Sequence, residues 1–111
     1  MMALTLLQID FPAAGPWGDA MAAAYTPLAE NIAQTPGLLW KLWTEDEATQ
    51  TTGGIYLFTE RAAAEAYLAM HSARLTAFGI TDIRAKLFAI NAPLTAMTHG
   101  APVTVDLLMA E

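Results

Sequence analysis

The sequence predicts an α+β domain in which a four-stranded antiparallel sheet carries two helices on one face. Four segments alternate in side-chain polarity at period two, as strands with two different faces do. Two further segments carry apolar side chains at spacings of three and four, which is typical of amphipathic helices. The order is strand, helix, strand, strand, helix, strand, and 111 residues suit one domain.

The first strand is expected over residues 3–11, and the first helix begins near Pro16. Proline suits the first helical position, because the N–H that it lacks would have no partner there. The apolar stripe from Trp17 to Ile32 predicts the helix, and Pro27 predicts a kink or a break inside it. Alternation places these strand residues on the face toward the helices: Thr5, Leu7, Ile9 and Phe11.

Residues 38–45 and 53–59 predict a hairpin, because both alternate and the connection between them is polar. Period-two counting places these side chains on the face toward the helices: Leu38, Trp40, Leu42, Ile55 and Leu57. The same counting places these on the uncovered face: Lys41, Trp43, Glu45, Tyr56 and Phe58. We therefore expect Trp40 in the core, and Trp43 either in dimer packing or in a cavity wall.

The second helix is expected over residues 61–77, with Thr59 as its N-cap and Gly79 closing it. Residues 81–90 alternate again and predict the fourth strand. Its expected core residues are Ile83, Ala85 and Leu87. Its expected residues on the uncovered face are Arg84, Lys86 and Phe88. The resulting order, β-α-β-β-α-β, is the ferredoxin-like arrangement.

The ferredoxin-like domain is expected to span residues 1–97, and residues 98–111 form a C-terminal extension. Within the extension, residues 103–108 could form a short strand that pairs with a sheet edge.

The composition favours self-association. Hydrophobic residues make up 55% of the chain and charged residues 14%, against a typical charged share of about 25%. A small domain has little interior, so we expect a second apolar surface to be buried in a homodimer. The alternative is that alanine, whose side chain is small, raises the apolar count without a dimer.

Charge and cysteine content exclude several function classes. The net charge is −6 and the five basic residues are scattered, so we expect no nucleic-acid partner. No apolar run approaches the about 20 residues that span a bilayer, and residues 1–11 lack the basic start of a signal peptide. The absence of cysteine is compatible with a cytoplasmic location.

The expected uncovered face mixes aromatic rings with charged groups. Solvent would not favour Trp43, Phe58 and Phe88 together, and a dry core would not tolerate Lys41 and Arg84 unpaired. A partly wet cavity between two such sheets satisfies both requirements.

These segments also resemble the YdhR-type mono-oxygenase family. The resemblance runs from about residue 3 to residue 97 and is most specific in the hairpin segments Pro36-Gly37-Leu38-Leu39-Trp40-Lys41-Leu42-Trp43-Thr44-Glu45 and Gly53-Gly54-Ile55-Tyr56-Leu57-Phe58-Thr59. It extends to Gly15-Pro16-Trp17-Gly18, to His71, to Ala73-Arg74-Leu75 and to Asn91-Ala92-Pro93-Leu94. The resemblance implies a dimeric α/β barrel and a mono-oxygenase that uses O₂ without a cofactor on a small phenolic or polyketide-like ring.

The candidate residues follow from residue type and expected facing. The candidate catalytic residues are His71, Tyr56 and Arg84. The candidate substrate-binding residues are Trp43, Phe58, Phe88, Lys41 and Lys86. Tyr56 or His71 would handle a proton, and Arg84 or Lys86 would stabilise an anion. His71 could equally be a core or dimer-edge histidine, and no ligand spacing suggests a metal.

Two other function classes remain open at this point. One is a non-catalytic homodimer that binds a small aromatic molecule in the same cavity. The other is a stress-related dimer without a ligand. Oxygen uptake in the presence of phenols separates the enzyme from both.

Overall fold

The computed structural model describes residues 4–100, and its elements are the expected ferredoxin-like ones and one further short helix, α3. They are β1 (Thr5–Pro12), α1 (Gly18–Ile32), β2 (Leu38–Asp46), β3 (Thr51–Phe58), α2 (Arg61–Ala77), β4 (Arg84–Ala89) and α3 (Ala92–Met97). The predicted fold class is confirmed, and α2 has the predicted bounds. The possible strand at residues 103–108 lies outside the described residues.

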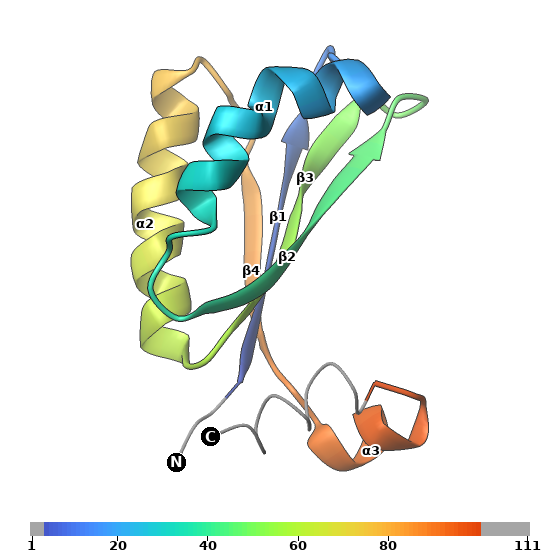
Figure 1. Ribbon diagram of the computed structural model, residues 1–111, viewed down its shortest axis with the longest axis vertical. Coiled ribbons are helices and arrows are strands. Elements are labelled where there is room, and N and C mark those ends of the chain that lie inside the picture. The colour runs from blue at the N-terminus through green and yellow to red at the C-terminus, as the bar shows by residue number, and fades with distance from the viewer. Residues whose placement is uncertain (1–3, 101–111) are drawn as a thin grey trace.

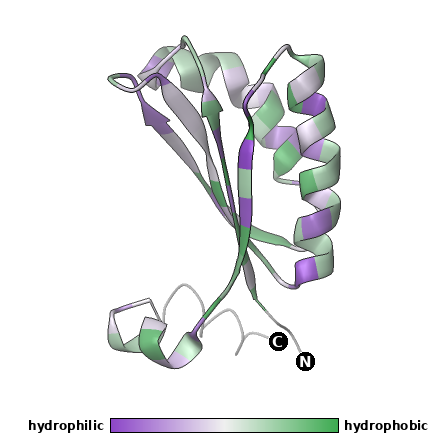
Figure 2. Ribbon diagram, turned by 180° about the vertical axis from the view of Figure 1, so that it is seen from behind, coloured by the Kyte–Doolittle hydropathy of each residue, from purple (hydrophilic) through white to green (hydrophobic). Residues whose placement is uncertain are grey.

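The four strands form one antiparallel sheet in the order β2-β3-β1-β4. Figure 1 shows α1 and α2 on the same side of this sheet, with α3 apart from them beyond the end of β4. Figure 2 shows the sheet from behind, where the β4 ribbon alternates between hydrophilic and hydrophobic residues. One sheet face is therefore covered by α1 and α2, and we call the other the open face.

The core lies between the sheet and the two helices. Leu7 and Ile9 of β1 and Tyr56 and Phe58 of β3 are at most 1% exposed. They cluster with Ile32 of α1 and with three side chains of α2: Ala64, Tyr67 and Leu75. Tyr56 and Phe58 add large aromatic surfaces to this core.

The predicted facing of the hairpin is wrong beyond Leu38. Leu38 pairs with Phe58 but Trp40 pairs with Leu57, so one extra residue interrupts the register between them. Such a bulge exchanges the two faces of the strand that follows it. Lys41 therefore lies on the helix side with its partner Tyr56, and Trp40 lies on the open face.

The facing of β3 is wrong for a second reason. Both of its faces are apolar, so alternation alone could not say which one meets the helices. The pairing with β1 settles it, because Tyr56 lies opposite Leu7 and Leu57 lies opposite Leu6. The predicted facings of β1 and β4 are confirmed, since Leu7, Ile9 and the β4 residue Leu87 all join the core.

Three further expectations about chain segments have outcomes in the structure. The α1 helix continues through Pro27 without a break. The N-cap of α2 is Glu60 rather than Thr59, and no side chain caps that end. The short helix α3 was not expected; the Asn91 side chain accepts a hydrogen bond from the backbone N–H of Leu94, 3.1 Å away, and starts it.

The loop before α1 is tied to β2. The backbone N–H of Gly18, the first residue of α1, donates to the Glu45 carboxylate at 2.8 Å. A carboxylate at this position also interacts favourably with the positive end of the helix dipole. The contact holds the start of α1 over the end of β2, which forms one side of the cavity described next.

Candidate functional site

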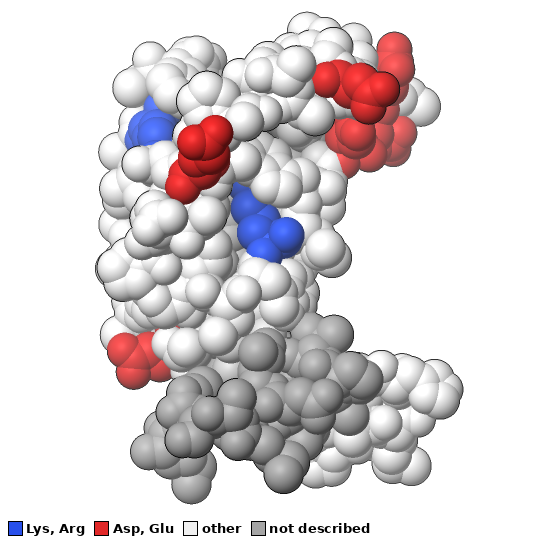
Figure 3. Space-filling model, viewed as in Figure 1, with Lys and Arg blue, Asp and Glu red and all other residues white. Residues whose placement is uncertain are grey.

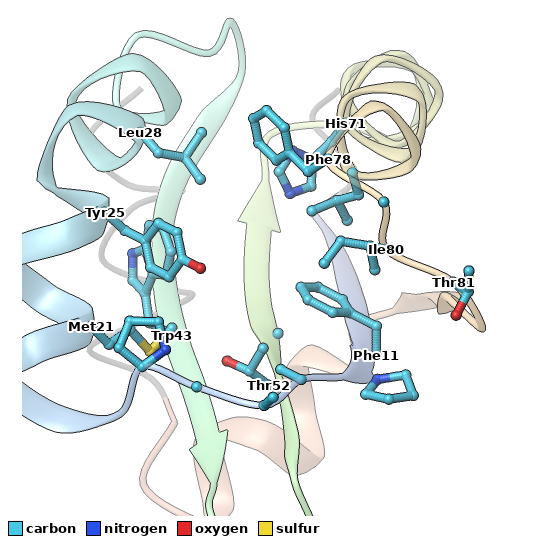
Figure 4. Close-up of a pocket in the computed structure, with 18 of the residues that line it drawn as sticks. Phe11, Met21, Tyr25, Leu28, Trp43, Thr52, His71, Phe78, Ile80 and Thr81 are labelled. Atoms are coloured by element: carbon cyan, nitrogen blue, oxygen red, sulfur yellow. The ribbon is translucent and has the colours of Figure 1, made fainter.

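A cavity of about 530 Å³ lies between α1, α2 and the covered face of the sheet. Figure 4 shows Tyr25 and Trp43 along one side and Phe11, Phe78 and Ile80 along the other, with His71 at one end. Lys41, Tyr56 and His71 are its titratable side chains besides Tyr25, and no described residue that lines it is an aspartate or a glutamate. The cavity is thus aromatic, with one cationic side chain.

Lys41 enters the cavity because Gly54 leaves room for it. A Cβ atom on Gly54 would lie 2.6 Å from Lys41 Cε and 3.0 Å from the Tyr56 ring. The Lys41 ammonium lies 3.3 Å from the centroid of the Trp43 ring and 4.7 Å from that of Tyr56. Trp43 in turn stacks on Tyr25 at 6.5 Å, so α1 supports the ring on which Lys41 rests.

The position of Lys41 weakens its hold on a proton. Burial, and then the positive charge of Arg74, lower the pKa of Lys41 from 10.5 to about 7. The two aromatic faces oppose this by about 0.5–2 kcal/mol, because they attract the ammonium form. One pKa unit corresponds to about 1.4 kcal/mol, so the rings offset only part of the lowering. A substantial share of Lys41 is therefore a neutral amine near neutral pH.

Tyr56 and Tyr67 stay protonated. Their hydroxyl oxygens are 3.3 Å apart, with Tyr67 donating, and their rings are 5.0 Å apart. Burial raises the pKa of both phenols above the ordinary value of 10. Since Tyr56 receives the hydrogen bond of Tyr67, it keeps its own hydroxyl proton for donation, and it does not act as a base.

His71 is neutral and its tautomer is fixed. The Arg74 side chain donates to His71 Nδ1, with Nε at 3.1 Å and Nη2 at 2.9 Å, and also donates from Nη1 to Asn31 of α1 at 2.8 Å. Burial, then Arg74 and Lys41, lower the pKa of His71 to about 4. Because Nδ1 accepts, the ring proton is on Nε2, and His71 offers a hydrogen-bond donor rather than a base.

The titratable groups of the cavity differ in which of them changes its protonation near neutral pH. Lys41 is the group whose protonation changes near neutral pH, while His71 and Tyr56 are neutral donors there. An acidic ligand that enters can pass its proton to Lys41 and leave its anion beside the resulting ammonium.

The structure brings four predicted site residues to this cavity: Lys41, Trp43, Tyr56 and His71. Phe58 does not line the cavity; it is fully buried in the core, with its ring 5.7 Å from that of Tyr67. Three others lie on the open face, as their pairing with β1 shows: Arg84, Lys86 and Phe88.

Arg84 is engaged by a carboxylate. Its Nε donates to Asp10 Oδ1 at 2.7 Å, and the two residues are paired across β1 and β4. The structure thus gives Arg84 an ion-pair partner on the open face, and it does not bring Arg84 to the cavity.

Sequence reasoning missed Arg74 and Tyr67, which hold His71 and Tyr56. Arg74 follows His71 by three residues, a spacing at which helical side chains meet, and that signal could have found it. Tyr67 precedes His71 by four residues, and their rings stack at 5.0 Å. The bond from Arg74 to Asn31 joins two helices and has no signature in the local sequence.

The described residues provide neither a cluster of metal ligands nor a membrane-spanning helix. Residues 4–100 contain no group of three side chains placed to hold a metal ion. No helix within that range has both the length and the apolar character to cross a membrane.

Comparison with known proteins supports the fold and assigns a family. The family described as "Putative mono-oxygenase ydhR" matches residues 6–101. A crystallised protein from Shewanella oneidensis is 11% identical, with a TM-score of 0.58 over 81% of this chain and 95% of its own. A protein of unknown function from Nitrosomonas europaea is 18% identical, with a TM-score of 0.56 over 82% of this chain and 91% of its own. No curated protein matches the sequence significantly.

Proposed function

Because the chain belongs to the ydhR family, we propose that it is a mono-oxygenase that oxidises a small phenolic ring in the cavity between the sheet and the helices, without a cofactor. The observation that carries this proposal is the desolvated Lys41 amine in an aromatic cavity whose described lining has no carboxylate. An apolar cavity with few polar groups is the usual form of a small-molecule site.

In the proposed reaction the substrate supplies the electrons. The phenol gives its proton to Lys41, and the phenolate is held by the Lys41 ammonium and by donors such as His71 Nε2–H. The phenolate passes one electron to O₂, and the resulting phenoxyl and superoxide radicals combine at a ring carbon. Loss of water leaves a quinone that carries one oxygen atom of O₂, while the other atom leaves in the water.

The aromatic walls account for the choice of substrate. Trp43 and Tyr56 flank Lys41, so a flat ring can stack beside the amine to which its hydroxyl must point. Water exclusion by these walls strengthens the attraction between ammonium and phenolate, because that attraction is weak in bulk water.

Oxygen uptake with a panel of phenols and hydroquinones tests the proposal. We expect uptake that depends on the protein and falls by at least about 100-fold in Lys41→Met, since general acid–base groups contribute about 10²–10⁴-fold. Lys86→Met is the matched control, because Lys86 lies on the open face and beside one aromatic ring, 5.2 Å from the Phe88 centroid.

Two results would contradict the proposal. Equal uptake by the wild type and Lys41→Met would remove Lys41 from the reaction. Saturable binding of phenols without any uptake of oxygen would instead identify a non-catalytic binding protein with the same cavity.

We also propose that the protein is a homodimer joined through the open sheet faces. One row across this face is apolar throughout: Trp40, Leu57, Leu6 and Phe88. Beside it, Leu42 is 59% exposed. Figure 3 shows few charged side chains on the visible surface, with acidic ones gathered near the turn between β2 and β3. Within the row Leu57 is buried at 1%, so the apolar surface that this face leaves exposed comes mainly from Phe88, which is 39% exposed, and from Leu42. Exposed apolar surface of this kind favours a second copy.

A further inference from the structure

Lys41 has the surroundings of a nucleophilic amine as well as those of a base. A lysine becomes a nucleophile when an apolar pocket desolvates it or another cation lies nearby, because both favour the neutral amine. Lys41 has both, since it lies in the aromatic cavity and experiences the charge of Arg74. None of the described residues that line the cavity carries a carboxylate that would hold the amine as an ammonium.

The space around the amine also suits a covalent ligand. The Lys41 Nζ rests on Trp43, and its chain crosses the position that a Gly54 side chain would occupy. The cavity of about 530 Å³ has room for a ring beyond the amine, and Phe11 and Phe78 line the opposite side (Figure 4). A small aromatic molecule can therefore stack in the cavity with a substituent directed at the nitrogen.

We propose that Lys41 captures small aromatic aldehydes and ketones as a Schiff base in this cavity. The Lys41 nitrogen forms a bond with the carbonyl carbon, and the carbonyl π bond breaks to give a carbinolamine. The oxygen then leaves as water with both amine hydrogens, and a C=N bond replaces the C=O bond. Nothing is oxidised or reduced in this condensation, so it needs no co-reactant.

Donors already in the cavity favour this condensation. His71 carries its proton on Nε2, and Tyr56 keeps its hydroxyl proton, so both can donate to the carbonyl oxygen. Neither His71 nor Tyr56 is anionic at neutral pH, so neither holds Lys41 in the unreactive ammonium form by forming an ion pair with it. The inference does not rest on oxygen chemistry and goes beyond the proposed mono-oxygenase activity.

The chain provides its own control for the test. Its two lysines are Lys41 and Lys86, and Lys86 is exposed on the open face of the single chain. Since that face is the proposed dimer interface, the same labelling is also run on Leu42→Glu, which is designed to keep this face in solvent. The full-length protein is incubated with benzaldehyde and sodium cyanoborohydride under argon at pH 7, which converts any imine to a stable benzyl amine. Peptide mass spectrometry then measures the benzylated fraction at each lysine and at the α-amine.

We expect Lys41 to be labelled at least about tenfold faster than Lys86. An ordinary exposed lysine has a pKa of about 10.4, so roughly one in 2,500 is neutral at pH 7, whereas the lowered pKa of Lys41 makes its neutral fraction many times larger. Part of this advantage is lost because a less basic amine is a weaker nucleophile. The same preference should disappear in urea, where the cavity no longer exists.

The result that overturns the proposal is equal labelling of the two lysines, or slower labelling of Lys41, in the folded protein. A preference for Lys41 that persists in urea would also overturn it, because the local sequence rather than the cavity would then be the cause. Since oxygen is excluded, Lys41 labelling and phenol-dependent oxygen uptake can succeed or fail separately, so the two proposals remain distinguishable.

Discussion

At the scale of single residues, Lys41 acquires its properties from groups that are distant in sequence. Gly54 makes room for its chain and Trp43 supports its ammonium, while burial in the cavity, and then the charge of Arg74 on α2, lower its pKa. Arg74 acts on His71 as well, by direct hydrogen bonds to Nδ1. One guanidinium thus favours the neutral forms of both the amine and the imidazole, and this prepares the cavity to receive a proton.

This arrangement predicts how stability changes with pH. In the folded chain the pKa of Lys41 is about 7, whereas in the unfolded chain it is near 10.5, so between these values the unfolded state binds more protons. Stability must then rise with pH in this window. We expect the free energy of unfolding to increase by about 1–2 kcal/mol from pH 7 to pH 9, because the aromatic rings offset part of the lowering.

Urea denaturation of the wild type and of Lys41→Met at both pH values measures this effect. The increase should be largely absent in Lys41→Met and present in Lys86→Met. A wild-type chain whose stability is flat from pH 7 to pH 9 would show that Lys41 remains an ammonium in the folded state.

At the scale of elements, the bulge in β2 determines what the cavity contains. Without the extra residue at position 39, Lys41 and Trp43 would point to the open face, as period-two counting predicts. With it, Trp43 stacks on Tyr25 of α1 at 6.5 Å, and Trp40 moves to the open face opposite Leu57. The two tryptophans therefore serve different surfaces of the molecule.

Substituting each tryptophan separates these surfaces. Trp43→Ala should weaken phenol binding by about two- to tenfold, since an aromatic contact is worth about 0.5–1.5 kcal/mol and 1.4 kcal/mol is a factor of ten. It should leave dimerisation unchanged. Trp40→Ala should weaken the dimer and leave the affinity of each cavity for phenol unchanged. Calorimetric titration and light scattering measure the two properties, and the opposite pattern would mean that β2 is regular.

Local patterns predicted the elements better than the facings. The predicted bounds of α2 agree with the observed ones, because its alanine-rich segment has a strong intrinsic helix preference. The predicted facing of β1 agrees with its observed pairing with β3. The β3 facing failed because both of its faces are apolar, and the β2 facing failed because a bulge leaves no clear local signal. The helix α3 was missed because it is only 6 residues long and begins at a proline-containing segment.

At the scale of the whole molecule, the two sheet faces have different tasks. The covered face holds the core and the cavity. The open face holds the apolar row and, four residues further along β1 and β4, the Asp10–Arg84 ion pair. That division explains why residue types alone could not assemble the site. The sequence identified Lys41, Trp43, Tyr56 and His71 as candidates, but it placed three of them on the open face with Arg84.

The proposed dimer can be tested on that face with one charge. Leu42 is 59% exposed on the open face, so Leu42→Glu should place two carboxylates in the interface and prevent association. Met70 of α2 is 45% exposed on the helix layer, and Met70→Glu is the matched control that should remain dimeric.

Light scattering at micromolar concentration should give twice the 11.9 kDa chain mass for the wild type and Met70→Glu. Leu42→Glu should give a folded species of the single-chain mass. A wild-type monomer, or a Leu42→Glu dimer, would show that a second copy does not cover this face.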